Sequence, residues 1–255
     1  MQMFAHHGMV LTLTTQVVLG FIVRKRVFLA EEDWRRIPFS QVPASPLQEL
    51  MGEAAGIPAV LESLDQAGTM PRASGISIAK SSLRQLVAVL ENLESWKGGF
   101  HSRFFKTPMF GSTLVGSKSD SEWPNLYFQS ITDANVATHF WAFRVICLAT
   151  IEQVAAQYPE AEFDRQILAA LMPGSNTVQE MIQLSTHICQ SMAYLMQEEM
   201  KLFGPSSILL PLRVAYDTFL AGQAHTAKQL AWCRSFLTDT IESGYRFVPV
   251  FFDPF

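Results

Sequence analysis

The stretch AKSSLRQLVAVLENL, Ala79 to Leu93, carries apolar side chains at every third or fourth position. Ala79, Leu83, Leu86, Leu90 and Leu93 would lie on one face of an α-helix, because a helix turns once every 3.6 residues. The alternation of apolar and polar residues that is typical of a strand does not occur here. The stretch therefore predicts an amphipathic helix with one face packed in a core.

Three further stretches repeat this helical spacing, and nowhere does a hairpin-type turn join two alternating apolar runs. The sequence therefore predicts an all-α fold, a single domain of about eight helices over residues 1–255. The three apolar seams consist of Val136, Phe140, Phe143, Cys147, Ile151 and Val154; of Val178, Met181, Ser185, Ile188, Met192 and Leu195; and of Leu230, Cys233, Leu237 and Ile241.

Signals for helix ends agree with these seams. Thr177–Glu180 and Thr226–Gln229 fit the capping box, in which a hydroxyl and a Glu or Gln satisfy backbone donors reciprocally. Gly244 follows the last seam and is expected to end it. Pro173-Gly174 and Gly204-Pro205 are expected to separate neighbouring helices.

Residues 106–130 show no helical periodicity and are predicted to form a long loop, at which the domain could be subdivided. Within them, GSTLVGSKS (Gly111 to Ser119) nearly matches a phosphate-binding loop. Ser117, however, stands where that loop needs a lysine that reaches the phosphates. A plain loop is the better interpretation.

The composition limits the class of partner. Of the 255 residues, 49% are hydrophobic and 16% are charged, and the net charge is −4. Disorder needs low hydrophobicity and high charge, so a packed helical body is expected. The three consecutive basic residues Arg24-Lys25-Arg26 are too few to form a nucleic-acid footprint. Direct DNA binding by this chain is therefore not expected.

Signs of catalysis, metal or cofactor binding and disulfides are lacking. The three cysteines are odd in number and far apart, which favours a reducing compartment and buried thiols. His6 and His7 are adjacent, and His187 and Cys189 are two residues apart, so neither pair shares a helix face. The sequence contains no Gly-x-Ser-x-Gly elbow. We therefore expect neither enzyme activity nor a bound metal or cofactor.

The apolar run from Met9 to Val23 is interrupted by Thr12, Thr14, Thr15 and Gln16. It is shorter than the about 20 apolar residues that span a bilayer, and it lacks the flanks of a signal peptide. A buried helix that ends in a basic turn is expected, with no membrane partner.

The stretch GPSSILLPLRVAYDTFL, Gly204 to Leu220, places a proline and two charges in an apolar run. Pro211 should bend or restart the helix, because proline lacks the backbone N–H. Arg213 and Asp217 are four residues apart and share a face. We expect Arg213 to be largely buried, with Asp217 or another acid beside it.

Four segments of the sequence belong together: RVFLAEEDWRRIPF (Arg26 to Phe39), ITDANVATHFWAFRVICL (Ile131 to Leu148), ICQSMAYLMQEEMKLFGPSSILLPLRVAYDTF (Ile188 to Phe219) and KQLAWCRSFLTDTIESGYRF (Lys228 to Phe247). In combination they resemble the helical regulatory region of fungal zinc-cluster transcription factors. They follow in the same order as in that family and together touch most of the chain. The residues that carry the resemblance are Trp34, Pro38, Cys189, Gln190, Gly204, Pro205, Pro211, Leu212, Arg213, Asp217, Trp232, Cys233 and Arg234.

The resemblance implies a regulatory and protein-interaction domain that acts in the nucleus on transcription of a metabolic or secondary-metabolite pathway. It implies protein partners or self-association, and it allows a small-molecule effector. The family's DNA-reading module uses six cysteines that hold two zinc ions, and this sequence lacks them. A fragment, an incomplete gene model and a natural regulator without that module remain as alternatives.

A second hypothesis is a helical enzyme or small-molecule carrier. Its pocket would lie near Met192, Met196, Arg213 and Trp232, because an apolar pocket with one convergent charge is a common ligand site. An upstream exon that encodes six cysteines would decide between the two hypotheses.

Overall fold

A computed structural model describes residues 16–40, 42–104, 124–163, 165–172, 176–200 and 203–245. The regular elements within these residues are all helices, so the all-α prediction is confirmed. The stretch from Gly111 to Ser119 and most of the predicted loop lie outside the described residues. Residues 124–130 of that loop are described and are not helical.

The chain divides into two compact units, each built from two separate segments. Unit 1 comprises residues 1–104 and 147–174, and unit 2 comprises residues 105–146 and 175–255. The sequence analysis expected a single domain with a possible division at the 106–130 loop. The chain changes unit just before that loop, and it also changes unit within helix α6 and again after residue 174.

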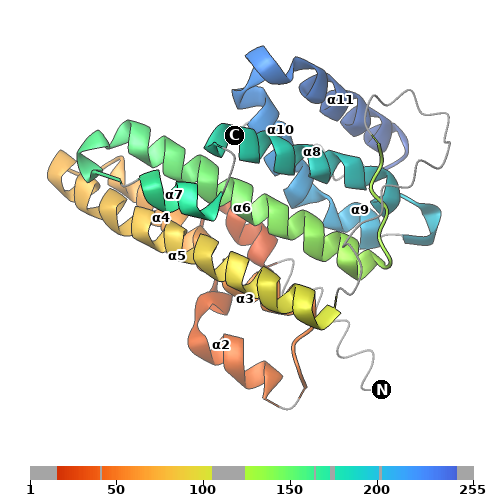
Figure 1. Cartoon of the computed structure of the whole chain (residues 1–255), viewed down its shortest axis with the longest axis horizontal. Helices are drawn as coiled ribbons and strands as arrows, with labels where there is room; N and C mark the ends of the chain where they lie inside the picture. The colour runs from red at the N-terminus through yellow and green to blue at the C-terminus, as the bar shows by residue number, and fades with distance from the viewer. Residues whose placement is uncertain are drawn as a thin grey trace. The chain divides into compact units, whose positions relative to one another are not determined.

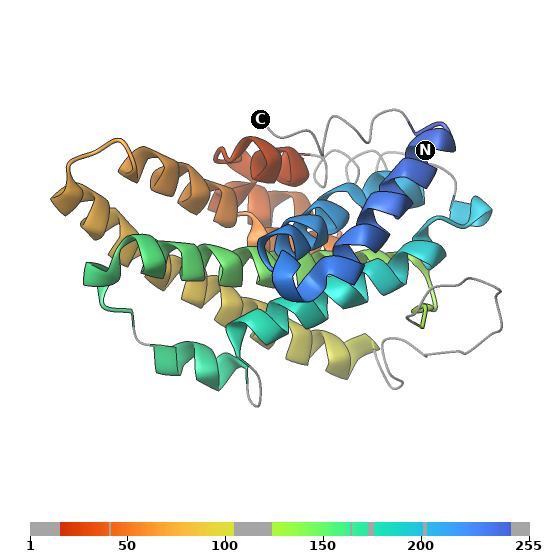
Figure 2. The same ribbon diagram turned by 90° about the horizontal axis from the view of Figure 1, so that it is seen from above.

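Unit 1 is organised around the long helix α5 (Figures 1 and 2), against which α3, α4, η3 and α7 pack. Its apolar seam from Ala79 to Leu93 is buried, as predicted. In chain order, the elements are helical residues 16–23, η1 (Phe28–Ala30), α2 (Glu32–Arg36), η2 (Ile37–Phe39), α3 (Pro46–Ala54), α4 (Ile57–Ala67), α5 (Arg72–Phe104), the end of α6, η3 (Pro159–Ala161) and α7 (Arg165–Leu171).

Unit 2 is organised around α10, which packs against both α8 and α11 (Figure 1). The predicted seams of α6, α8 and α11 contribute buried core positions, although Val178 and Ile241 are exposed and Met181 is half-buried. The elements are the first part of α6 (Ile131–Gln157), α8 (Thr177–Leu195), η4 (Glu198–Met200), α9 (Phe203–Ser207), α10 (Leu209–Ala221) and α11 (Gln223–Glu242).

Two predicted helix starts are shifted in the structure. The cap of α8 is Asn176 rather than Thr177, and the Asn176 side chain accepts a hydrogen bond from the Gln179 backbone N–H. Helix α11 begins three residues before Thr226, whose non-helical backbone marks a kink. The Thr226 hydroxyl donates to the Phe219 carbonyl instead of capping a helix. The predicted end at Gly244 is confirmed, since its φ of +99° suits glycine.

Pro211 restarts a helix, which is one of the two outcomes predicted for it. Helix α9 ends at Ser207 and α10 begins at Leu209, so Pro211 lies in the first turn of α10. Backbone N–H groups in a first turn have no partner within the helix, so a proline there removes no hydrogen bond. The first backbone hydrogen bond of α10 is from the Leu212 N–H to the Ile208 carbonyl, at 2.8 Å.

Helix α6 is the one helix among the described residues that is long and apolar enough to cross a membrane. However, 89% of its most apolar window is buried inside the protein. A core helix satisfies the same length and composition test, and the burial of α6 is that of a core helix.

Candidate functional site

The motif residues Cys189 and Cys233 meet in the core of unit 2. They come from α8 and α11, and their sulfur atoms lie 3.6 Å apart as free thiols. Burial raises the pKa of the Cys189 thiol well above its usual value, because a thiolate is poorly solvated there. Both cysteines are buried and pack as small core residues, as the sequence predicted.

Gly204 and Pro205 are also buried, where α9 follows the end of α8. A Cβ atom at Gly204 would collide with the backbone carbonyl of Leu195, so this position has room only for glycine. Gln190 contributes through its backbone, because its carbonyl accepts a hydrogen bond of 2.9 Å from the Leu126 N–H. These motif residues hold unit 2 together.

Arg213 and Asp217 form the predicted ion pair, with 2.8 Å between Nε and Oδ2. The prediction that Arg213 is largely buried is wrong, because the side chains of Arg213 and Asp217 are 30% and 50% exposed. Partial burial raises the pKa of Asp217, and the hydrogen bond from Arg213 opposes this rise. The pair lies at the surface of α10 and not in its core.

Among the described residues of unit 2, the buried ion pair is instead Arg144–Glu180, which joins α6 to α8. Nη2 of Arg144 lies 3.1 Å from Oε1 of Glu180, and the two side chains are only 4% and 18% exposed. This pair was not predicted, because Arg144 was not singled out in the sequence and Glu180 was assigned to a capping box. A usable signal existed, since Arg144 is the lone charge in the apolar run HFWAFRVICLAT, His139 to Thr150.

His139 is a second buried polar residue of α6 in unit 2. Its Nδ1 lies 2.8 Å from the Asn135 carbonyl oxygen, within the same helix. Burial lowers the pKa of His139 to about 4, because the charged imidazolium is poorly solvated. The ring is therefore neutral at neutral pH and serves packing.

The remaining motif residues of unit 2 range from buried to exposed. Trp232 stacks on Phe236 with ring centroids 5.1 Å apart, Leu212 is buried and Arg234 is exposed. Met192 is fully buried in the core and Met196 is partly exposed. A pocket near Met192 and Trp232 stays a prediction.

An exposed apolar surface lies in unit 1, on the segment that contains Trp34 and Pro38. Its four large apolar side chains, Phe28, Trp34, Ile37 and Val42, are 43% to 58% exposed. The Phe28 and Trp34 rings meet edge to face at 4.8 Å. We call these four residues the exposed apolar segment. Helix α2 packs on η1 and η2, and in Figure 1 it lies at the lower edge of the ribbon.

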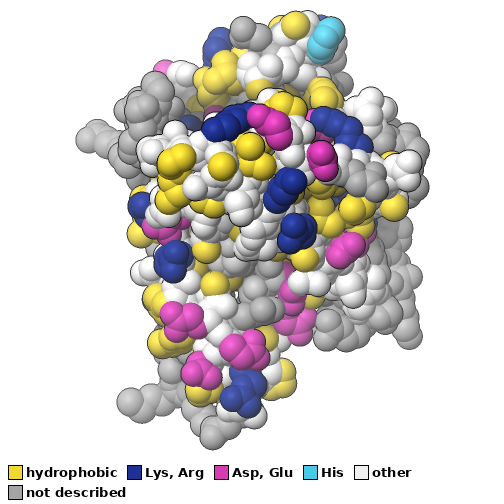
Figure 3. Space-filling view, turned by 90° about the vertical axis from the view of Figure 1, so that its left-hand side faces the viewer, with side chains coloured by type: hydrophobic (Ala, Val, Ile, Leu, Met, Phe, Trp, Pro, Cys, Tyr) yellow, Lys and Arg dark blue, Asp and Glu magenta, His cyan; other side chains and the backbone are white. Residues whose placement is uncertain are grey.

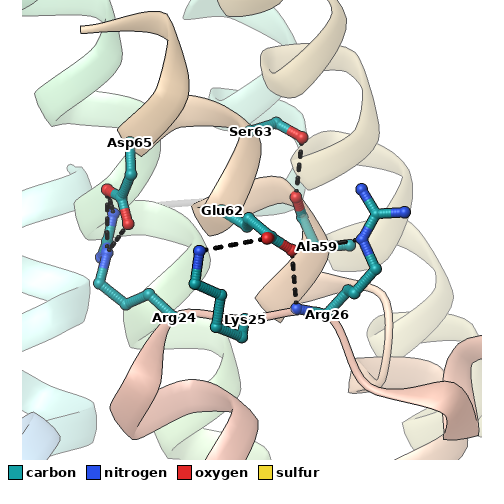
Figure 4. Close-up of polar contacts among 7 residues, drawn as sticks. All are labelled: Arg24, Lys25, Arg26, Ala59, Glu62, Ser63 and Asp65. Atoms are coloured by element: carbon teal, nitrogen blue, oxygen red, sulfur yellow. Dashed lines mark hydrogen bonds and ion pairs between the residues drawn. The ribbon is translucent and has the colours of Figure 1, made fainter. Parts of the chain in front are cut away.

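The basic turn before this segment is fixed to α4 by carboxylates (Figure 4). Arg24 makes a bidentate contact with Asp65, with distances of 2.8 Å from Nη2 to Oδ1 and from Nε to Oδ2. Glu62 accepts hydrogen bonds from the Arg26 backbone N–H and from the side chains of Lys25 and Arg26. These donors, the backbone N–H first, lower the pKa of Glu62.

The three basic residues are thus paired with two carboxylates of α4 at the protein surface, and they position the chain that enters η1. On the face drawn in Figure 3, basic and acidic side chains are interspersed, with no broad area of one sign. That face therefore lacks the basic stripe that duplex DNA requires. Within the described parts of the chain, His, Cys, Asp and Glu residues form no group of three or more that could hold a metal ion.

Comparisons with protein-family models, curated proteins and solved structures find no match to this chain. The functional interpretation therefore relies on the residues themselves and on their geometry.

Proposed function

We propose that this chain is a regulatory, protein-interaction domain of the fungal zinc-cluster transcription factor type. The observation that supports it best is the exposed apolar segment. Trp34 belongs to the residues that carry the resemblance, and its exposed ring meets that of Phe28. Ile37 and Val42 are exposed further along the same segment. Exposed apolar clusters mark interaction sites on proteins, and tryptophan is enriched among residues that dominate binding energy.

In this proposal the partner is a protein, and the domain works without DNA contacts of its own. The buried motif residues of unit 2 support the fold, and the exposed apolar segment of unit 1 provides the contact. The bidentate pair between Arg24 and Asp65 holds the start of the segment against α4. A pre-positioned surface loses less conformational entropy when a partner binds.

A transcriptional reporter tests the proposal. The full chain is fused to an unrelated DNA-binding domain in a yeast host, and reporter output is compared with that of the DNA-binding domain alone. We expect the fusion to change the output, and Trp34→Ala and Ile37→Ala to abolish the change. Met70→Ala is the control, because Met70 is similarly exposed but lies outside the segment. An unchanged reporter, or equal output from the Trp34 and Met70 variants, would overturn the proposal.

The absence of DNA binding is tested separately by gel shift at low salt with random duplex DNA. We expect no retention of the probe, since DNA affinity depends on phosphate neutralisation by Lys and Arg. Tight binding that weakens with salt would place the chain in another class.

A further inference from the structure

Unit 1 contains a groove of about 420 Å³ between α5 and the chain that runs from η3 into α7. Its volume falls within the range of about 300–1,000 Å³ that is usual for small-molecule sites. Leu83 and Val87 of α5 lie at its base and are nearly inaccessible to solvent. Phe163 and Ile167 line it from the other side, and Ile167 is 40% exposed. The groove therefore offers an apolar contact area that the unit leaves open.

Two basic side chains, Lys80 and Arg84, line the same groove from α5. They are four residues apart and so share a helix face. Neither forms an ion pair or a side-chain hydrogen bond with any described residue, whereas Arg72 and Arg165 of the same unit pair with Glu160 and Glu152. Two neighbouring cations without carboxylate partners favour an anion between them.

Two carboxylates restrict which anion can bind. Glu91 and Glu162 also line the groove, so its lining carries two positive and two negative charges. A ligand with several negative charges would be repelled by these acids, whereas a single carboxylate beside Lys80 and Arg84 would not. Glu162 has a left-handed backbone with a φ of 52°, a conformation that is uncommon outside glycine and is often found at functional positions.

We infer that this groove binds a small monocarboxylate with an aromatic or branched aliphatic body. The Arg84 guanidinium would take the carboxylate in a bidentate contact, and Lys80 would add a second positive charge. The apolar body would lie on Leu83 and Val87 against Phe163 and Ile167. This inference does not rest on the proposed function, because it uses only the lining of one groove in unit 1.

The test uses 4-phenylbutyrate as the probe, with titration calorimetry and saturation-transfer NMR on the full chain. The uncharged alcohol 4-phenylbutanol and the cation 4-phenylbutylamine have the same apolar body and serve as matched probes. We expect the carboxylate to bind at least about tenfold more tightly than either, because only it can pair with Arg84 and Lys80.

Two groove variants and one control locate the site. Arg84→Gln removes one charge, and Ala88→Phe fills the groove without changing any charge, since Ala88 is an exposed lining residue. Each should weaken 4-phenylbutyrate binding by about tenfold or more. Arg234→Gln on the exposed face of α11 should leave the binding unchanged.

Three outcomes would overturn the inference. They are no binding of 4-phenylbutyrate at millimolar concentration, equal binding of the carboxylate and the amine, and equal affinity of the wild type and the Arg84→Gln variant. The reporter assay with the Trp34 variant is independent of all three, so failure of one proposal leaves the other standing.

Discussion

Some of the residues that carry the family resemblance are buried in unit 2, and one of those in unit 1 is exposed. In unit 2, Cys189 and Cys233 are buried between α8 and α11, and Gly204 is buried in α9, whereas Trp34 in unit 1 is about half exposed. Substitution of a buried residue must disturb packing, and substitution of an exposed one need not. The difference shows that one sequence pattern can contain residues that maintain the fold and residues that are available to a partner.

Of the substitutions that test this contrast, Arg144→Ala should have the largest effect on stability. It leaves Glu180 largely buried without its cation, and breaking a buried pair costs about 3–5 kcal/mol. We expect a loss of that size in the free energy of unfolding, measured by urea denaturation. Arg165→Ala is the matched control, because its pair with Glu152 is mainly exposed and contributes about 0–1 kcal/mol. Equal losses in both variants would remove the distinction between buried and exposed pairs.

Gly204→Ala should have the next largest effect. The added methyl group meets the backbone of Leu195, which cannot rotate away as a side chain can, and overpacking typically costs about 1–3 kcal/mol. Gly98→Ala provides the control within α5, where nothing lies near the added atom. The Gly98→Ala variant should be more stable than the wild type by about 0.5–1 kcal/mol, because alanine favours a helix more than glycine does. A Gly204 variant that melts like the wild type would show that α9 adjusts freely.

A pH titration of stability tests the buried imidazole of His139. Its pKa is about 4 in the folded protein and about 6.5 when unfolded, so below pH 6.5 the unfolded chain binds more protons. This group therefore contributes stability at neutral pH that is lost as the pH falls, by about 2 kcal/mol at pH 5.

In His139→Gln, the part of the pH dependence between pH 4 and 6.5 that comes from this residue should vanish. Chemical denaturation at several pH values provides the measurement. Parallel pH profiles for the wild type and the variant would mean that the ring is solvated.

Arg213→Ala should have the smallest effect of the four. Its pair with Asp217 is partly exposed, and such pairs contribute about 0–1 kcal/mol. Melting of the wild type, Arg213→Ala, Asp217→Ala and the double variant isolates the coupling between the two side chains. If Arg213→Ala lost as much stability as Arg144→Ala, the Arg213–Asp217 pair would behave as a buried pair, contrary to this expectation.

Apolar spacing predicted the helices because burial of one face leaves a periodic trace in the sequence. The seam from Ala79 to Leu93 is buried throughout. Spacing alone could not rank the ion pairs, since Arg213 and Arg144 both occur in apolar runs. The two arginines differ in whether a neighbouring helix supplies the acidic partner. Arg144 faces Glu180 of α8, while Arg213 pairs along its own helix near solvent.

Other features depend on residues far apart in the chain and could not be predicted from local pattern. The basic turn from Arg24 to Arg26 is paired with the carboxylates of Glu62 and Asp65, about 40 positions away. The groove beside Lys80 needs the chain from η3 to α7, which joins α5 only in the folded unit. The shifted start of α8 has a local cause, since Asn176 is as good a cap as Thr177.

The division of each unit into two segments has a consequence for synthesis on the ribosome. Residues 1–104 leave the ribosome first, but η3 and α7, which complete the packing on α5, lie within residues 147–174. At about 5–20 residues per second, roughly 4–14 s pass before the chain has grown from residue 104 to residue 174. During that interval Leu83 and Val87 lack their final neighbours, so the nascent chain displays an apolar surface that the finished protein reduces to a groove.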